Sequence, residues 1–172
     1  MDKNLLQDLK KEITGEVAED EQTLKNFSHD ASIFEVNPRA VVFPKDIQDI
    51  KNLVNFVSKH KKNYPLLSLT ARSAGTDMSG GSLNDSIIVS FTQHFNQIKG
   101  IEDNIATTQP GVYYRDFEKY TLKSNLIFPP YPSSREICAI GGIVNNNAGG
   151  EKSFEYGKAE NYVKKVKMVL SD

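Results

Sequence analysis

The chain has 172 residues, of which 38% are hydrophobic and 25% are charged, and these proportions are typical of a globular protein with a real core. Its 21 basic and 22 acidic residues leave a net charge of −1, so neither nucleic acid nor an anionic membrane surface is an expected partner. One cysteine and three scattered histidines provide neither an internal disulfide nor the ligand spacing of a metal site.

Apolar runs are short throughout the sequence. The longest span about five residues, whereas a helix that crosses a bilayer needs about 20. The N-terminal residues Met-Asp-Lys-Asn also lack the features of a signal peptide. We therefore expect no membrane span and a cytoplasmic location, while attachment to a membrane through a partner stays open.

The first 35 residues, 1–35, are predicted to form an N-terminal helical extension. Residues 4–14 place their apolar side chains on one face, which is typical of a short amphipathic helix. The polar residues 16–26 have helical character only around Leu24. Neither segment carries residues that suggest chemistry.

A strand, a helix and a second strand are predicted next. The β-branched run at residues 40–43 indicates a buried strand, and residues 46–61 place apolar side chains at helical spacing after Asp46, which suits an N-cap. Residues 65–70 form another short apolar run. This order predicts a right-handed crossover between parallel strands. The residues that follow the second strand would then lie at its carboxyl end, where ligands of parallel sheets bind.

Residues 70–82 form a loop of small residues, Thr-Ala-Arg-Ser-Ala-Gly-Thr-Asp-Met-Ser-Gly-Gly-Ser, with three of the eleven glycines. The glycines indicate unusual backbone angles or close approach to another group. The N–H groups and small hydroxyls of such a loop suit a pyrophosphate. A tight, solvated connection between two strands is the alternative interpretation.

The pattern then changes to short strands with short connections, at residues 87–91, 96–101 and 105–109. Residues 102–104 predict a hairpin turn, and Pro110-Gly111 ends the strand pattern. Residues 113–124 predict a helix that ends near Asn125, and we assign no chemistry to its aromatic side chains. Prolines exclude both helix and central strand from residues 129–134.

A second stretch of small residues, 138–150, holds four glycines and three asparagines. It again suggests that the backbone approaches a ligand closely, and its apolar Ile140, Ile143 and Val144 favour a packed segment over a flexible surface loop. Residues 166–170 alternate apolar and other side chains and predict a half-buried strand. No turn residue or cap follows, which suggests that the sequence stops within a structural motif.

Two common nucleotide-binding motifs fit the first loop poorly. Residues 75–82 approach the pattern G-x-x-x-x-G-K-[ST] of nucleoside triphosphatases. However, Gly81 replaces the lysine that would contact the β- and γ-phosphates, and a strand pattern rather than a helix follows. The dinucleotide fingerprint G-x-G-x-x-G is absent from the sequence.

Taken together, the two small-residue stretches resemble a more specific pair of motifs. Residues 72–76 and 79–81 resemble the R-G-G-G-T-x-x-S-G-G segment of FAD-linked oxidases of the vanillyl-alcohol oxidase and p-cresol methylhydroxylase superfamily. Residues 132–134, 140–142 and 145–150 resemble the second signature of that family, P-S-S…I-G-G…N-x-G-G. The same template also fits residues 30–32, 41–44 and 156–157. In character the chain is most similar to the flavoprotein subunits of glycolate oxidase and to D-lactate dehydrogenases.

The resemblance implies an α+β fold of two small subdomains, the first with parallel and the second with antiparallel strands, which hold FAD between them. The expected FAD-binding domain comprises residues 36–172. Its first subdomain would span about residues 36–82 and its second about residues 83–172, incomplete at the C-terminus. The order of the predicted elements agrees with this arrangement.

The resemblance also implies which residues contact FAD. The pyrophosphate would be bound by Arg72, Ser73, Ala74, Gly75, Thr76, Asp77, Ser79, Gly80 and Gly81, although Arg72 in a structural ion pair is an alternative. The isoalloxazine and ribityl groups would contact Pro132, Ser133, Ser134, Ala139, Ile140, Gly141 and Gly142. The remaining contacts would come from Pro110, Gly111, Asn145, Asn146, Ala148, Gly149, Gly150 and Gly157.

Some positions depart from the family pattern. Ala74 replaces a usual glycine, Tyr131 stands where an aspartate is common, and Ala139 lacks a hydroxyl that often precedes Ile-Gly-Gly. Thr76 occupies the position at which covalent family members carry a histidine, so non-covalent FAD is expected. Outside the motifs, Cys138 is expected to be a buried small residue.

We therefore expect the FAD-binding portion of a flavin-dependent oxidoreductase that oxidises a small 2-hydroxy acid by hydride transfer to non-covalent FAD. The family places its substrate-binding and general-base residues in a following domain, so we assign no catalytic residue and expect this portion alone to be inactive. The electron acceptor is not predicted. A stand-alone nucleotide-binding or interaction module without redox activity is the alternative hypothesis.

Overall fold

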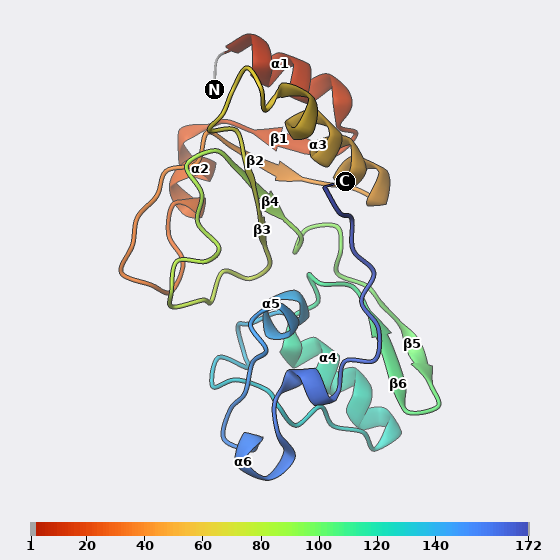
Figure 1. The fold of residues 1–172 in the computed structure, drawn as a ribbon. Coiled ribbons are helices and arrows are strands. Elements are labelled where there is room, and N and C mark those ends of the chain that lie inside the picture. The colour runs from red at the N-terminus through yellow and green to blue at the C-terminus, as the bar shows by residue number, and fades with distance from the viewer. Residues whose placement is uncertain (1–2, 172) are drawn as a thin grey trace.

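The computed structural model describes residues 3–171 and contains two sheets (Figure 1). The four strands of the larger sheet lie in the order β1 (Glu16–Ala18), β2 (Ala40–Phe43), β4 (Ile87–Ser90) and β3 (Leu69–Arg72). Strand β1 is antiparallel to β2, whereas β2, β4 and β3 are parallel. The second sheet is an antiparallel hairpin of β5 (Ile98–Glu102) and β6 (Ile105–Thr108). The predicted α+β class, with a parallel and an antiparallel part, is confirmed.

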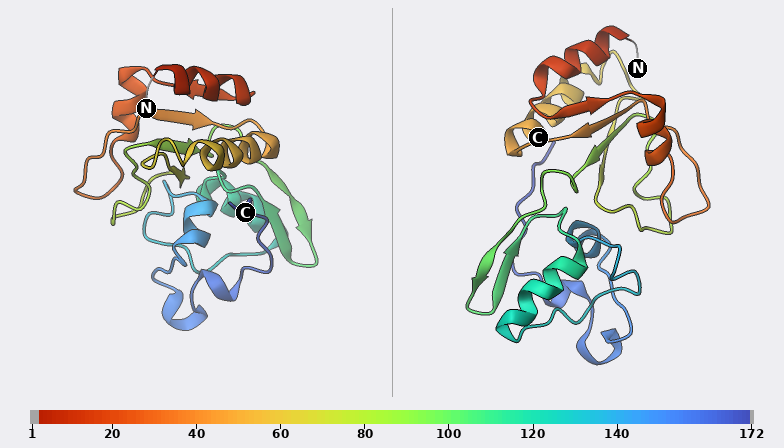
Figure 2. Two further views of the ribbon diagram at one scale, coloured as in Figure 1. Left: turned by 45° about the horizontal axis from the view of Figure 1, so that its top comes forward. Right: turned by 180° about the vertical axis from the view of Figure 1, so that it is seen from behind.

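Three helices pack with the larger sheet: α1 (Lys3–Glu12), α2 (Glu21–Phe27) and α3 (Ile47–His60). Helices α1 and α3 lie together over one face of the sheet, and the second half of the chain lies on the other side (Figures 1 and 2). Leu9 of α1, Leu53 of α3 and Val42 of β2 are fully buried in the core between them. Helices α1 and α3 therefore bury their apolar stripes against the sheet, whereas α2 has no buried residue.

Helix α3 begins where the sequence predicts it. The Asp46 side chain accepts a hydrogen bond from the Asp49 N–H at 3.0 Å and caps the helix. The Asp49 carboxylate, only 1% exposed, accepts further N–H bonds from Thr14, Gly15 and Lys45 at 2.8–2.9 Å. One buried carboxylate thus joins the turn between α1 and β1 to the start of α3.

The second half of the chain has its own core. It contains α4 (Tyr114–Thr121), α5 (Ile140–Asn145), α6 (Ser153–Tyr156) and the 3-10 helices η1 (Leu122–Ser124) and η2 (Ala159–Asn161). Tyr114, Phe117, Tyr131 and Ile143 are buried together in this core. The predicted hairpin turn is confirmed, because Asp103 and Asn104 adopt φ angles of 48° and 61° between β5 and β6.

Strand β4 was assigned to the hairpin-rich half, and this assignment is wrong. The strand lies between β2 and β3 and is parallel to both. All four of its residues, 87–90, are buried, which is the pattern of a central strand covered on both faces. The predicted boundary near residue 82 therefore falls before the last strand of the larger sheet, and the division into subdomains stays a proposal.

Other expectations at the two ends of the chain also need correction. The polar stretch after the first helix forms strand β1 as well as helix α2, and β1 extends the larger sheet, so residues 1–35 are not a purely helical extension. Residues 166–170 are not a strand. Their Val166, Met168 and Leu170 side chains are 50–65% exposed, and within residues 3–171 no strand pairs with them.

Two local predictions need smaller corrections. The run at residues 65–70 begins with a turn, in which the Leu67 N–H bonds the Tyr64 carbonyl, so β3 starts only at Leu69. The stretch 138–150, predicted only as a packed segment that approaches a ligand, contains helix α5. No helix within residues 3–171 is long and apolar enough to cross a membrane.

Candidate functional site

The loop after β3 requires glycine at two positions. Gly75 and Gly80 have φ angles of +68° and +79°, a backbone region that other residues rarely adopt. A Cβ atom on Gly75 would also lie 2.5 Å from a guanidinium nitrogen of Arg72. As predicted, the loop leaves the carboxyl end of a parallel strand (Figure 1).

The first half of this loop presents free backbone donors. Among the described residues, no protein group accepts a hydrogen bond from the N–H groups of residues 73–77. Their side chains are small, so a ligand can approach the backbone closely. Consecutive free N–H groups of this kind form an anion-binding surface.

The second half of the loop is folded onto Asp77. The Asp77 carboxylate accepts hydrogen bonds from the Ser79 hydroxyl at 2.8 Å and from the Gly81 N–H at 2.7 Å. The bond from Ser79 is the main cause that lowers the pKa of Asp77 below its ordinary value. Two of the predicted pyrophosphate donors, Ser79 and Gly81, are therefore engaged within the protein.

Arg72 lies at the end of β3 and is 9% exposed. Its guanidinium donates hydrogen bonds to the carbonyls of Phe27 at 3.1 Å and His29 at 2.6 Å, and lies 5.0 Å from the centroid of the Phe27 ring. Burial lowers the pKa of Arg72, although nearby Asp30 acts in the opposite direction. Within the described part of the chain it forms no ion pair, so the alternative of a structural ion pair is not observed. A buried guanidinium therefore lies beside the loop, with Asp30 nearby.

The two glycine-rich segments meet at one carbonyl. The Pro110 oxygen accepts hydrogen bonds from the Ser73 hydroxyl and from the Gly141 N–H, both at 2.8 Å. Asn146 also donates a longer hydrogen bond to the Asp77 carboxylate at 3.4 Å. Residues that lie far apart in the sequence are thus brought to one place between the two halves.

Helix α5 presents open backbone at Gly142. The preceding N–H groups of Ile140 and Gly141 bond to the carbonyls of Val112 and Pro110, but no described residue accepts from the Gly142 N–H. A Cβ atom on Gly142 would meet nothing within 4 Å. Gly141, in contrast, packs against Pro110, since its added Cβ would lie 2.7 Å from the proline Cβ.

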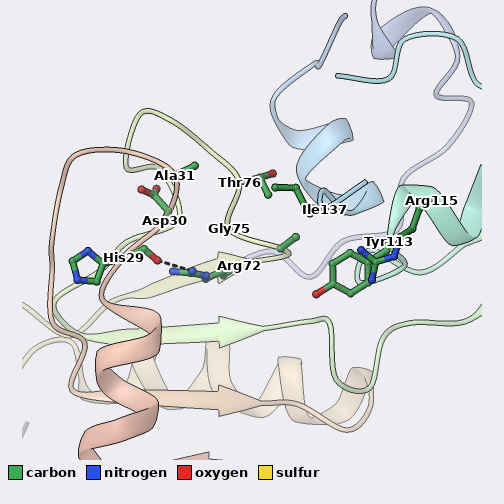
Figure 3. A pocket seen from close by; sticks show the side chains of 10 residues that line it. His29, Asp30, Ala31, Arg72, Gly75, Thr76, Tyr113, Arg115 and Ile137 are labelled. Atoms are coloured by element: carbon green, nitrogen blue, oxygen red, sulfur yellow. Dashed lines mark hydrogen bonds between the residues drawn. The ribbon is translucent and has the colours of Figure 1, made fainter. Parts of the chain in front are cut away.

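A pocket of about 420 Å³ lies between the two halves. Figure 3 shows its walls, which are formed by His29, Asp30, Ala31, Arg72, Ala74, Gly75, Thr76, Tyr113, Arg115 and Ile137. Four of these, Arg72, Ala74, Gly75 and Thr76, were predicted from the sequence. Asp30 and Ala31 were recognised only as part of the family template. Tyr113 and Arg115 were missed, because aromatic and basic residues at the start of a helix give no signal of a ligand.

Several predicted site residues have local structural roles. A Cβ atom on Gly150 would lie 2.0 Å from the Tyr131 carbonyl oxygen, and Gly157 has a φ of +81° at the end of α6. Helix α6 lies at the end of the second half that is remote from the loop after β3 (Figures 1 and 2). The Ser134 carbonyl accepts the N–H groups of Ile137 and Cys138, which shapes the proline-rich turn.

Tyr131, where this chain departs from the family pattern, and the nearby Cys138 are both buried. Tyr131 is buried, its hydroxyl donates to the Glu151 carboxylate at 2.9 Å, and the Arg135 guanidinium lies 4.7 Å from its ring centroid. Cys138 is 3% exposed, and burial raises the pKa of its thiol. The prediction that Cys138 is a buried small residue is confirmed.

Comparison with known proteins gives consistent matches. The family model described as "FAD binding domain" matches residues 38–172. D-2-hydroxyglutarate dehydrogenase of Escherichia coli strain K12 is 32% identical over 170 residues, which are 97% of this chain and 16% of that protein. Glycolate oxidase subunit GlcD of Bacillus subtilis strain 168 is 33% identical over 150 residues, 85% of this chain and 31% of that protein. D-lactate dehydrogenase of Archaeoglobus fulgidus is 31% identical over 144 residues, 80% of this chain and 31% of that protein.

Solved structures show the same fold. An alkyldihydroxyacetonephosphate synthase structure matches with a TM-score of 0.77 at 16% identity, over 94% of this chain and 32% of that one. The wild-type BBE-like 1 protein of Physcomitrella patens matches with a TM-score of 0.75 at 16% identity, over 91% of this chain and 34% of that one. The chain thus spans about a third or less of the proteins that it matches here.

Proposed function

The chain belongs to the FAD-binding domain family, and from this premise we propose that it is the FAD-binding portion of a flavin-dependent oxidoreductase acting on a small 2-hydroxy acid. FAD is the cofactor of this family. The names of three relatives at 31–33% identity denote enzymes of 2-hydroxy acids: D-2-hydroxyglutarate, glycolate and D-lactate. These relatives support the substrate class, while the alternative of a module without redox activity has no support among them.

The residues present fit FAD. The observation that carries the proposal is the junction at Pro110, where both glycine-rich segments bond to one carbonyl. On one side lie the free N–H groups of residues 73–77 and the buried Arg72, which forms no ion pair within the described residues. Both suit a diphosphate. On the other side, Gly142 leaves space and a free N–H for a planar ring system to approach the backbone.

Each segment has a distinct task in this proposal. Residues 73–77 would hold the diphosphate, and the backbone at Gly141 and Gly142 would hold the flavin end. Bound FAD would supply the two-electron redox chemistry needed to oxidise the carbinol carbon of the 2-hydroxy acid. The chain's own contribution is to bind and orient the cofactor between its halves and to exclude water from the covered part. We assign no catalytic acid or base to these residues.

The proposal includes non-covalent attachment of FAD. Thr76 lines the pocket at the position of the family's covalent histidine, and a threonine hydroxyl is a weak nucleophile without an adjacent base. Acid denaturation of the FAD-loaded protein should therefore release all flavin into the supernatant. Flavin that remains with the precipitated protein would contradict non-covalent binding.

A titration of the 172-residue chain with FAD tests the proposal. We expect quenching of flavin fluorescence and a change in the visible flavin bands that saturate with added protein, and no such change with NAD. A visible spectrum without flavin bands after FAD addition and desalting, together with unquenched fluorescence in the titration, would overturn the proposal.

The substrate class has its own test. FAD-loaded protein that contains this chain and all further parts of the enzyme should lose oxidised-flavin absorbance without oxygen on addition of glycolate, D-lactate or D-2-hydroxyglutarate. A simple primary alcohol should leave the absorbance unchanged. Reduction by the alcohol but by none of the 2-hydroxy acids would contradict the substrate class. The cytoplasmic location stays a prediction, and no electron acceptor is assigned.

A further inference from the structure

Two arginines face the same pocket from opposite halves of the chain. Arg72 belongs to the end of β3, and Arg115 belongs to the first turn of α4. In Figure 3 the Arg72 guanidinium lies on the His29 side of the pocket, and the Arg115 guanidinium lies beside the Tyr113 ring. The family motifs described above include Arg72 but not Arg115.

The Arg115 side chain is held in place but not neutralised. Its guanidinium carbon lies 4.4 Å from the centroid of the Tyr113 ring, and one nitrogen donates a hydrogen bond to the Glu136 carbonyl. Within residues 3–171 Arg115 forms no ion pair, and no protein group accepts its other N–H groups. A guanidinium has five N–H donors in a planar fork that matches phosphate oxygens. Most of these donors are therefore free for a ligand.

The acidic group of the pocket, Asp30, forms no ion pair with either guanidinium among residues 3–171, although its charge acts to raise the pKa of Arg72. Asp30 uses its carboxylate oxygens to accept hydrogen bonds from the Ser32 N–H at 2.8 Å and the Ser82 hydroxyl at 3.3 Å. His29, which also lines the pocket, lies 3.4 Å from the carboxylate of Glu35, and Glu35 is not part of the lining. The pocket thus combines two guanidinium groups without ion pairs and the free N–H groups of residues 74–76, a donor set suited to a diphosphate.

We propose that Arg115 is a cofactor-binding residue that holds the diphosphate of FAD from the second half of the chain, opposite residues 73–77. Tyr113 is a positioning residue that keeps the guanidinium in the pocket. This inference rests on the proposed function and extends its site across the two halves. A substrate carboxylate would suit the same guanidinium, and the experiment distinguishes the two ligands.

The test measures the affinities of the 172-residue chain for FAD and ADP by calorimetry at two salt concentrations. The variant Arg115→Gln should bind both ligands on the order of tenfold to a hundredfold more weakly, as expected for one charge-assisted contact. Its affinity should also fall less steeply with salt than that of the wild type. Arg115→Lys should recover part of the loss, since it restores the charge but not the fork.

Lys119→Gln is the matched control, because it removes a cation from the same helix at an exposed position outside the pocket. It should leave both affinities unchanged. The thermal unfolding midpoint of ligand-free Arg115→Gln should equal that of the wild type. Glycolate, D-lactate and D-2-hydroxyglutarate should fail to displace ADP.

Three outcomes would overturn the inference and leave the proposed function standing. These are wild-type affinities in Arg115→Gln, a loss of affinity that accompanies a lower unfolding midpoint with unchanged salt dependence, and displacement of ADP by a 2-hydroxy acid. Failure of the wild-type chain to bind either FAD or ADP would overturn both the inference and the proposed function.

Discussion

Gly75 is the residue at which the proposed diphosphate site depends most on backbone conformation. Its φ of +68° and the nearby Arg72 guanidinium both oppose a side chain. We predict that Gly75→Ala lowers the free energy of unfolding by about 1–3 kcal/mol and weakens FAD binding. Urea unfolding and FAD titration measure the two effects.

Gly142→Ala serves as the comparison for Gly75→Ala. An added Cβ meets no atom within 4 Å there, and the residue lies inside α5. The free energy of unfolding should stay the same or rise by roughly 0.5–1 kcal/mol, because alanine favours a helix over glycine. Equal destabilisation by the two changes would show that the left-handed conformation of Gly75 is not what the fold requires.

Ser90 carries a buried hydroxyl that the fold does not use. The residue is 1% exposed, and its Oγ has no hydrogen-bond partner among residues 3–171. An unsatisfied buried hydroxyl is unfavourable, so Ser90→Ala should raise the free energy of unfolding by about 1 kcal/mol.

Ser28 is the matched control for Ser90, since it is equally buried but its hydroxyl donates to the Lys25 carbonyl at 2.9 Å. Ser28→Ala should therefore destabilise the chain by about 1 kcal/mol. Urea unfolding measures the change in the free energy of unfolding for both variants. A loss of stability in Ser90→Ala as large as that in Ser28→Ala would contradict the assignment of an unpaired hydroxyl.

At the scale of elements, the Asp49 carboxylate connects the α1–β1 turn to α3. Burial by itself would raise the pKa of Asp49, but the N–H groups of Thr14 and Lys45 outweigh it and hold the pKa below its ordinary value. A lowered folded-state pKa means that the stabilisation is fully present above the unfolded-state pKa of about 3.9 and is lost as the pH falls through the folded-state value.

Asp49→Asn should therefore be less stable than the wild type at neutral pH, by about 2–3 kcal/mol, with the difference shrinking below about pH 4. Urea unfolding across a pH series measures this. Asp8→Asn is the control: Asp8 pairs with Lys11 at 2.8 Å but is 54% exposed, so its removal should change little. A constant difference between wild type and Asp49→Asn at all pH values would contradict the role of the carboxylate charge.

Elements that are determined by neighbouring residues in the sequence could be predicted. Elements whose form or position depends on contacts with distant residues could not. Helix α3 follows from helical spacing and the cap at Asp46, and the β5–β6 turn follows from residues that tolerate positive φ. Strand β4 was misplaced because its position between β2 and β3 is a property of the whole sheet. Helix α5 was missed because Gly141, Gly142 and Asn145 disfavour a helix, which forms here with Ile143 buried in the core.

At the scale of the whole molecule, the site is made by the contact between the two halves. The motifs at residues 72–76 and 140–142 could be found in the sequence, but their meeting at the Pro110 carbonyl is visible only in the structure. Tyr113 and Arg115 also join the pocket only because α4 begins beside it. Their residue types alone are equally typical of a core or an exposed face.

The most direct test of the two-sided site is hydrogen–deuterium exchange of the chain with and without FAD. The free N–H groups of residues 73–77 and of Gly142 should exchange rapidly without ligand. We predict that saturating FAD slows exchange in peptides that cover residues 73–77 and in peptides that cover residues 140–146, while peptides from α1 stay unchanged. Protection of only one segment, or of neither, would contradict a cofactor site shared by the two halves.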